Sequence, residues 1–370
     1  MPRDLISFAA ASQSLLDAAV DPSQWVRAME TIAQYGNATG AVLLQVKGRG
    51  PGTPHSRSLE EGLKVYFRDQ WHLRDQRTRG LPLIKTKGIF VDQDFASRDE
   101  LEKSDYYRGF LAKFDANWSA VIGFSNSEDE WCLVLERGDK QGFYDSHEQN
   151  DLVRFAPYLN QAALLARNLA YANATGMVDA YESLGCACFL LDHFGKVIRY
   201  NAQAQLILGD GLDLSWGNIR CSSPVDSLAL TNLIAEIRQN TVRNATNPLP
   251  FVLAHRPPKR PLIIQAICLS GLTAAIFSPA RAILLVSDPE KRPAPTPPDL
   301  LKKLFNLTLT ETALISHLEQ EIALPAAAEI MGISFETARS HLKRIFSKTG
   351  TGRQTDLLML IQRVHRGGIV

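Results

Sequence analysis

Residues 333–350 read ISFETARSHLKRIFSKTG, and this stretch decides the fold of the C-terminal part of the chain. At about 100° per residue, a helix that starts after Ser334 separates its apolar side chains from its polar ones. The apolar side carries Ala338, Leu342, Ile345 and Phe346. The opposite arc carries Glu336, Ser340, Lys343, Arg344 and Ser347, with Arg339 at its edge. The stretch therefore predicts an amphipathic helix whose outward face is small, polar and basic.

Two further helices are predicted on the N-terminal side of this stretch. Thr308 and Glu311 have the spacing of a capping box, which marks the start of a helix. Residues 325–331 form a short helix with Pro325 in its first turn and Gly332 at its end. Two helices joined by a tight glycine turn, the second of them basic, are typical of a helix-turn-helix motif.

The charge distribution favours the same interpretation. From residue 300 onward the chain has nine Lys and Arg against six Asp and Glu, a net charge of +3. The whole chain has a formal net charge of +1, so the first 299 residues carry about −2. A small basic module attached to a near-neutral body suits a polyanion such as DNA. Arg and Lys on the outward face can donate to guanine acceptors or to phosphates in a major groove.

The C-terminal sixty residues resemble the DNA-binding domain of LuxR-type transcription regulators. The resemblance rests on the LT-x-x-E opening at 307–311, the IS-x-x-T start at 333–337, the H-L-x-x-I-F-x-K core at 341–348 and the late Arg353-Gln-Thr. Ala338 stands where the family usually has valine, and Thr349 where it usually has leucine. These departures affect packing and leave the polar face intact.

The resemblance implies roles for individual residues. Arg339, Ser340 and Lys343 should face bases, and Thr337, Lys348 and Arg353 should contact or orient towards phosphates. Ser334 and Arg344 complete the predicted DNA-binding set. A fourth helix over residues 354–364 should carry the contact between two modules of a homodimer. A dimer of this kind reads an inverted-repeat operator in double-stranded DNA, with half-sites about one helical turn apart.

The first part of the chain is expected to be an α+β sensory domain over residues 1–175. The predicted elements are a strand at 40–46, a helix at 59–76, a strand pair at 118–124 and 130–136, and a connector helix from Ser146 to about Thr175. Pro157 should kink that connector or mark its true start. In layout the domain is similar to GAF-like and autoinducer-binding domains.

A candidate ligand site follows from that second resemblance. Tyr66-x4-Trp71-x3-Asp75 has the spacing found in acyl-homoserine-lactone receptors, and Trp118 is a further candidate wall of the pocket. In those receptors an aromatic wall packs the ligand and an aspartate accepts its amide N–H. Gln76 departs from the pattern, because the receptors have proline there. The alternative is that the aromatics are core residues and Asp75 is a helix cap.

Residues 176–290 are expected to form a second α+β unit, followed by a proline-rich linker at 291–299 and an all-α, four-helix module at 300–370. The pattern from Leu190-Leu-Asp through Gly195 and Val197 to Asn201 and Ala204 resembles a PAS domain. Such domains bind small molecules or haem, or act as spacers between protomers. The segment 288–298 has five prolines in eleven residues, which excludes helix and central strand.

Other function classes find little support. The sequence lacks a P-loop, an H-E-x-x-H and a G-x-S-x-G motif, so no enzyme is predicted. Its five cysteines are unevenly spaced and complete no zinc site, and no cofactor is predicted. The apolar N-terminus is interrupted by polar residues, so a cytoplasmic protein without membrane contact is expected. The prediction is a ligand-responsive, dimeric DNA-binding regulator, with RNA polymerase as a further partner. Two alternatives stay open, an adaptor of the transcription machinery and a haem- or flavin-binding sensor.

Overall fold

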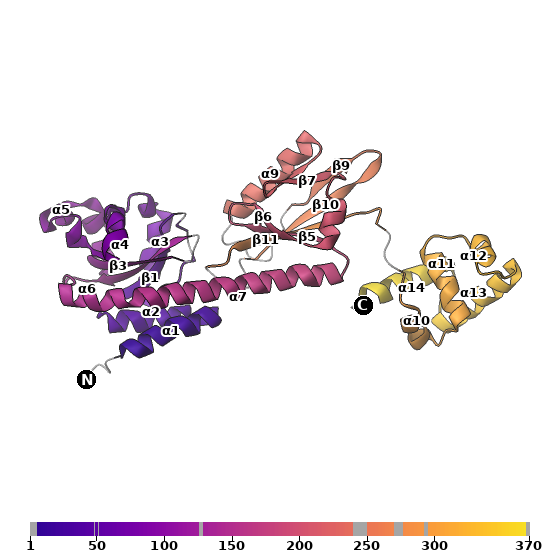
Figure 1. Ribbon diagram of the computed structural model, residues 1–370, viewed down its shortest axis with the longest axis horizontal. Coiled ribbons are helices and arrows are strands. Elements are labelled where there is room, and N and C mark those ends of the chain that lie inside the picture. The colour runs from indigo at the N-terminus through magenta and orange to yellow at the C-terminus, as the bar shows by residue number, and fades with distance from the viewer. Residues whose placement is uncertain are drawn as a thin grey trace.

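The structure is a computed structural model that describes residues 6–47, 49–50, 52–125, 129–239, 250–269, 277–291 and 295–367. It has a mixed α/β fold in which sheets with their packed helices extend to Ser287, and the described residues from Pro298 onward form helices alone (Figure 1). In its first sheet the four strands lie in the order β1-β4-β3-β2, and all neighbours are antiparallel. Their bounds are Gly40–Gln45 (β1), Ile89–Val91 (β2), Trp118–Ser125 (β3) and Glu130–Arg137 (β4).

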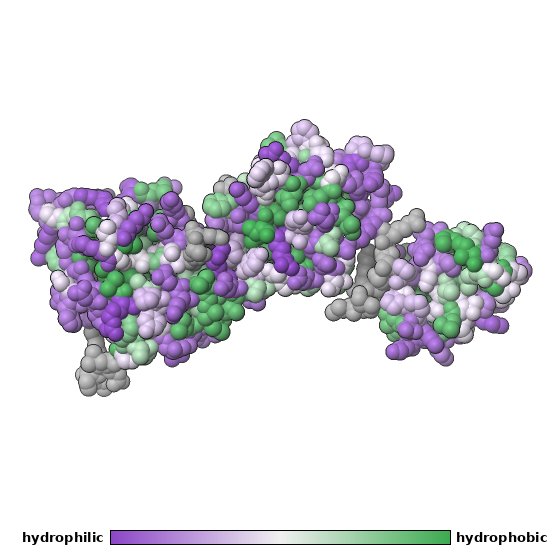
Figure 2. Space-filling model, in the orientation of Figure 1, coloured by the Kyte–Doolittle hydropathy of each residue, from purple (hydrophilic) through white to green (hydrophobic). Residues whose placement is uncertain are grey.

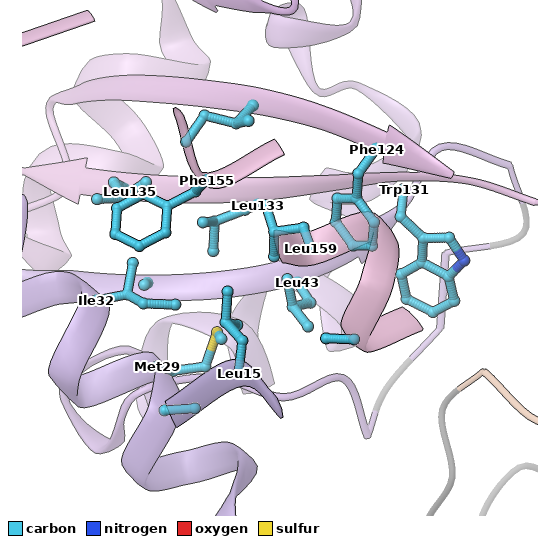
Figure 3. Close-up of a cluster of buried hydrophobic side chains, with 14 of the residues drawn as sticks. Leu15, Met29, Ile32, Leu43, Phe124, Trp131, Leu133, Leu135, Phe155 and Leu159 are labelled. Atoms are coloured by element: carbon cyan, nitrogen blue, oxygen red, sulfur yellow. The ribbon is translucent and has the colours of Figure 1, made fainter. Parts of the chain in front are cut away.

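Both faces of this sheet are buried, because helices pack on each of them. The helices on one face are α1 (Phe8–Val20), α2 (Trp25–Tyr35) and the long α7 (Ala156–Ser183). Figure 3 shows Leu15 and Met29 of these helices packed against Leu43 of β1 and Leu133 of β4. The other side is covered by α3 (Glu60–Arg68), α4 (Leu81–Lys87) and α5 (Arg98–Lys103), and α6 (Ser146–Leu152) leads into α7.

Two sequence predictions in this part need correction, and a third is decided between its two alternatives. The predicted helix 59–76 is regular only to Arg68, because Gln70 takes a left-handed φ of 58° and short 3-10 turns follow. The capping box of the connector uses Asp145 as N-cap with Glu148, one residue before the predicted pair. Pro157 lies in the first turn of α7, so it marks a start and not a kink.

The connector helix α7 is longer than expected and reaches a second sheet. It runs 28 residues without a break and contacts β3 near its start and β5 near its end. Val178 and Ala174 of α7 are buried against the second sheet. Figure 2 shows hydrophobic residues at the surface beside α7 and the C-terminal end of α1, where Val20, Leu164, Leu165 and Leu169 are exposed.

The middle part of the chain is built on a five-stranded antiparallel sheet with the order β6-β5-β11-β10-β9. Its bounds are Ala187–Asp192 (β5), Val197–Tyr200 (β6), Val252–Arg256 (β9), Lys259–Cys268 (β10) and Ala280–Ser287 (β11). A separate hairpin joins β7 (Leu212–Ser215) to β8 (Asn218–Cys221), and the helices are α8 (Ala202–Ile207) and α9 (Pro224–Gln239). Asn201 caps α8 as predicted and also accepts from the Cys188 backbone, which fastens α8 to β5.

The C-terminal part has five helices where four were predicted. They are α10 (Pro298–Phe305), α11 (Leu309–Glu319), α12 (Leu324–Ile330), α13 (Phe335–Thr349) and α14 (Gln354–Gly367). The additional helix α10 starts at the last proline of the linker, which fits the first turn of a helix. Leu301 of α10 is fully buried in the module's core with Leu314 and Ile345. Residues 368–370 of the predicted module lie outside the described residues.

The predicted linker is fixed to the module at its C-terminal end. Thr296 is fully buried, and its backbone N–H and hydroxyl both donate to the Glu319 carboxylate of α11. Residues 292–294 of the linker lie outside the described residues. The C-terminal end of the predicted linker therefore packs on the module, and its residues 298 and 299 belong to α10.

Candidate functional site

The outward face of α13 is the first candidate site. Ser334 lies in extended backbone, and its hydroxyl accepts the Thr337 N–H at 3.1 Å, so the helix begins where the sequence predicts. Ala338, Leu342 and Ile345 are buried and hold the helix on the core of the module. The exposed polar residues of this face are Glu336, Thr337, Arg339, Ser340, Lys343, Arg344 and Ser347. Phe335 and Lys348 of the same helix are exposed as well.

The basic residues of this face are available for an external partner. Arg339, Lys343 and Arg344 are exposed, and no described residue forms an ion pair with any of them. Arg353 is likewise exposed at the start of α14. Exposed guanidinium and ammonium groups without internal partners suit contacts to an anionic polymer. Whether these residues bind DNA stays a prediction.

Lys348 differs from the other predicted DNA contacts. Its ammonium lies 2.8 Å from the Glu311 carboxylate and 2.9 Å from the Asn306 carbonyl. Glu311 is 2% exposed, and its carboxylate also accepts the Thr308 N–H in the capping box. Burial would raise the pKa of Glu311, but the hydrogen bonds from Lys348 and Thr308 hold that pKa below its usual range. Lys348 therefore ties α13 to α11, and a phosphate contact by this residue stays a prediction.

The second candidate site is a pocket in the first part of the chain. It lies between β1, α3 and the segment 106–116, and its empty space, the open mouth included, measures about 450 Å³. The cavity volume that compares with those of other proteins is about 40 Å³. The lining is mostly apolar with a few polar groups, as is common in small-molecule sites. The lining residues are Val42, Leu44, Leu59, Gly62, Leu63, Tyr66, Asp75, Arg77, Tyr106, Phe110, Leu111, Phe114, Ala116 and Glu136.

Two of the four predicted ligand residues meet in this pocket. The Tyr66 hydroxyl donates to Asp75 at 2.8 Å, and both side chains are nearly fully buried. Trp71 stacks on Phe110 at 5.3 Å between ring centroids and does not line the pocket itself. Trp118 packs against Phe143 at 4.1 Å and also lies outside the lining. The predicted set is therefore divided between the pocket and the aromatic cluster behind it.

Asp75 is held in a buried network. Arg49 donates to its carboxylate at 2.5 Å and to the Tyr66 hydroxyl at 2.7 Å. The Asp75 side chain also accepts the Arg77 N–H and so caps the 3-10 turn that follows. Burial would raise the pKa of Asp75, but the nearby charges of Arg49 and Arg77 hold that pKa below its usual range. Asp75 stays ionised and acts as a cap, as the alternative interpretation of the sequence held.

A second buried ion pair closes the polar end of the pocket. Arg77 donates two hydrogen bonds to the Glu136 carboxylate, at 2.5 and 2.9 Å. Its Nε lies 3.7 Å from Asp92, which accepts from the Tyr107 hydroxyl and from Ser119. Burial raises the pKa of Glu136 to about 7. Burial likewise raises the pKa of Asp92, in contrast to that of Asp75.

Sequence reasoning missed most of the polar residues of this pocket. Arg49, Arg77, Tyr106 and Glu136 belong to no motif, and Glu136 of β4 lies 59 residues after Arg77, its partner in a 3-10 turn. One signal was present, because Arg77 follows Asp75 at a spacing that lets a side chain cap a turn. No group of three or more metal-ligating side chains occurs among the residues that the structure describes. No helix in the described ranges is long and apolar enough to cross a membrane.

Comparisons with known proteins give only distant structural likenesses. No family model and no curated protein matches the chain. The ligand-binding domain of VqsR from Pseudomonas aeruginosa is similar at 16% identity and a TM-score of 0.32, covering 43% of this chain and 95% of that one. The phage VqmA–DPO complex is similar at 15% identity and a TM-score of 0.21, covering 53% and 88%. The Escherichia coli DhaR(N)–DhaL complex is similar at 13% identity and a TM-score of 0.23, covering 75% and 86%. Values this low define no family for the chain.

Proposed function

We propose that this protein is a ligand-responsive transcription regulator of the LuxR type. In this proposal α13 enters the major groove of double-stranded DNA, and the pocket beside Tyr66 binds a small effector. The protein acts as a homodimer on an inverted repeat, with α14 at the contact between modules. The middle unit is a PAS-like spacer or second sensor. The protein performs no catalysis.

One observation carries the proposal: α13 is capped and held on its apolar side while its basic side is free. A recognition helix needs both properties, because it must keep its position while base edges and phosphates replace water. Arg339 and Lys343 lie one turn apart on the exposed face, at the separation at which two side chains can reach neighbouring bases. Ser340 between them is small and allows a close approach.

The test is retention of a DNA duplex by the purified full-length chain. A pool of random duplexes is bound at low ionic strength, and several rounds of selection recover a preferred sequence. Wild-type protein should retain that sequence and release it steeply as salt rises, because bound phosphates release counterions. Arg339→Ala or Lys343→Ala should weaken binding of the selected duplex by roughly 1–3 kcal/mol.

Lys103→Ala is the matched control. Lys103 is exposed on α5 and pairs with Asp99, far along the chain from the C-terminal module. Its removal should leave duplex binding unchanged. Failure of the wild-type chain to retain any duplex at low ionic strength would overturn the proposal.

A second candidate function is that of a protein-binding adaptor. It is favoured by apolar side chains that are exposed on the C-terminal module, namely Leu309, Ile330, Phe335 and Met359. A contact through such residues to RNA polymerase should persist at high salt, whereas DNA binding should not. For the haem or flavin alternative, a visible absorption spectrum of the purified protein gives a direct answer.

A further inference from the structure

Tyr106 is a buried polar residue of the pocket whose hydroxyl has no partner among the described residues. The side chain is 3% exposed and lines the pocket. It lies in a π-helical turn, Tyr106–Phe110, a geometry that occurs often at functional sites. Burial raises the pKa of Tyr106 well above 10.0, and the nearby charge of Asp75 raises it further. Tyr106 shares the lining of the pocket with Asp75, Arg77 and Glu136, and its hydroxyl keeps its proton.

Most of the other polar groups at that end are already engaged. One Asp75 oxygen accepts from both Arg49 and Tyr66, and the other accepts the Arg77 N–H. The Glu136 carboxylate is held by two hydrogen bonds from Arg77. Because both Asp75 oxygens already accept hydrogen bonds, Asp75 is poorly placed to accept an N–H from a ligand. Accepting that N–H is the role that the resemblance to the receptors implies for Asp75. The donors left for a ligand are the Tyr106 hydroxyl and the Nε of Arg77, which is buried without a hydrogen-bond partner among the described residues.

The charge of the buried cluster limits the ligand further. Arg49 and Arg77 supply two positive charges, against three carboxyl groups from Asp75, Asp92 and Glu136. The net charge of these five side chains is −1, or zero when one carboxyl group is protonated. No positive charge is left over for an anionic ligand, and burying an unpaired anion there would be costly. The rest of the lining is aliphatic and aromatic, which suits an uncharged molecule.

We propose that the Tyr106 hydroxyl donates a hydrogen bond to the acceptor oxygen of an uncharged, mainly apolar ligand in this pocket. The apolar part of the ligand contacts Leu59, Leu63, Phe110 and Leu111. The anchor is thus Tyr106 and not Asp75, whose role is to hold Arg49 and the turn in place. This inference rests on the proposed effector pocket and names the chemical class of its ligand.

Four probes of similar shape test the inference on the full-length chain. They are acetophenone, with a carbonyl acceptor; ethylbenzene, without a polar group; benzoate, an anion; and 1-phenylethylamine, a cation. Ligand-observed nuclear magnetic resonance gives their dissociation constants. Wild-type protein should bind acetophenone about three- to tenfold more tightly than ethylbenzene, the factor that one hydrogen bond supplies. Benzoate should bind most weakly.

Two adjacent variants separate the anchor from a structural role. Tyr106→Phe should bind acetophenone and ethylbenzene equally and should keep the melting temperature of the wild type. Tyr107→Phe is the matched control. The Tyr107 hydroxyl donates a hydrogen bond to the Asp92 carboxylate at 2.5 Å, and Tyr107 does not line the pocket. This control should lose stability and keep the preference for acetophenone.

The outcomes distinguish this inference from the proposed function. An unchanged preference in Tyr106→Phe, the tightest binding by the amine or benzoate, or no binding of any probe overturns the inference. If the chain still retains its selected duplex, the DNA-binding proposal stands in each of these cases. Loss of duplex retention by the wild type overturns the proposed function whatever the probes show.

Discussion

The Lys348 ammonium lies 2.8 Å from the Glu311 carboxylate, and this ion pair joins the last turn of α13 to the first turn of α11. Glu311 is buried and Lys348 is one third exposed, so the pair is shielded on one side only. Removal of the lysine would leave a buried carboxylate with the Thr308 N–H as its one donor among the described residues. The pair thus belongs to the structure of the module and orients the proposed recognition helix.

Lys348→Met should therefore destabilise the C-terminal module by about 1–3 kcal/mol, the usual cost of a buried charged group that loses its partner. All five tryptophans of the chain precede residue 217, so fluorescence does not report on this module. Hydrogen exchange of peptides from α11 and α13 is the suitable measurement. Lys343→Met, on the free face of the same helix, should leave the exchange unchanged. Equal protection in both variants would contradict the role given to Lys348.

The salt dependence of DNA binding should show that Arg353 contacts a phosphate and that Lys348 does not. Arg353→Ala should lower the slope of log K against log salt by about 0.9, the value for one lost phosphate contact. Lys348→Arg keeps the charge beside Glu311 and should leave the slope as in the wild type. A slope that falls with Lys348→Ala by as much as with Arg353→Ala would show that Lys348 leaves Glu311 to contact a phosphate.

Ser334 should contribute through the N-cap of α13. Ser334→Ala removes the acceptor of the Thr337 N–H and should cost about 1 kcal/mol. Faster hydrogen exchange should be confined to the first turn of α13 and to α12, which packs on it. Ser334→Asp restores an acceptor and should recover the protection, while Ser347→Ala on the exposed face should have no effect.

The buried Glu136 should make stability depend on pH. Its pKa is about 7 in the folded protein and near 4.5 when exposed, so the folded state binds a proton that the unfolded state releases. Stability should therefore fall as pH rises from 4.5 to 7, by no more than about 3 kcal/mol.

Glu136→Gln should remove this part of the pH dependence, as followed by the fluorescence of Trp131 on the same strand. Glu130→Gln, at the exposed end of that strand, should retain the wild-type profile. Identical profiles for the wild type and Glu136→Gln would show that Glu136 titrates normally.

The sequence predicted the elements whose signals are local. The capping box at Thr308, the N-cap Ser334 and the left-handed Gly332 with φ 65° are fixed by neighbours within a turn, and the structure confirms them. The strand pair β3–β4 is likewise confirmed, in register from Trp118 with Arg137. Domain bounds and the DNA-contacting roles stay predictions.

The elements that the sequence did not predict depend on distant contacts. Helix α10 follows a proline-rich stretch and is stable because Leu301 enters a core formed by α11, α13 and α14. The pocket depends on Arg49, Arg77 and Glu136, which come from three separate segments and meet only after the sheet has formed. Ion pairs of this kind leave no periodic pattern in the sequence, so residue spacing alone pointed to Trp71 and Trp118 instead.

The unbroken course of α7 restricts how the chain can change during evolution. A helix of 28 residues is a rod of about 42 Å, and each inserted residue turns its far end by about 100° and moves it by about 1.5 Å. A side chain at Gly176 would meet nothing within 4 Å, so substitutions there are tolerated sterically. Insertions and deletions in the helix are a different case. Insertions and deletions rotate the second sheet relative to the first about the axis of α7. Only changes of length close to whole helical turns keep the contacts at both ends of the helix.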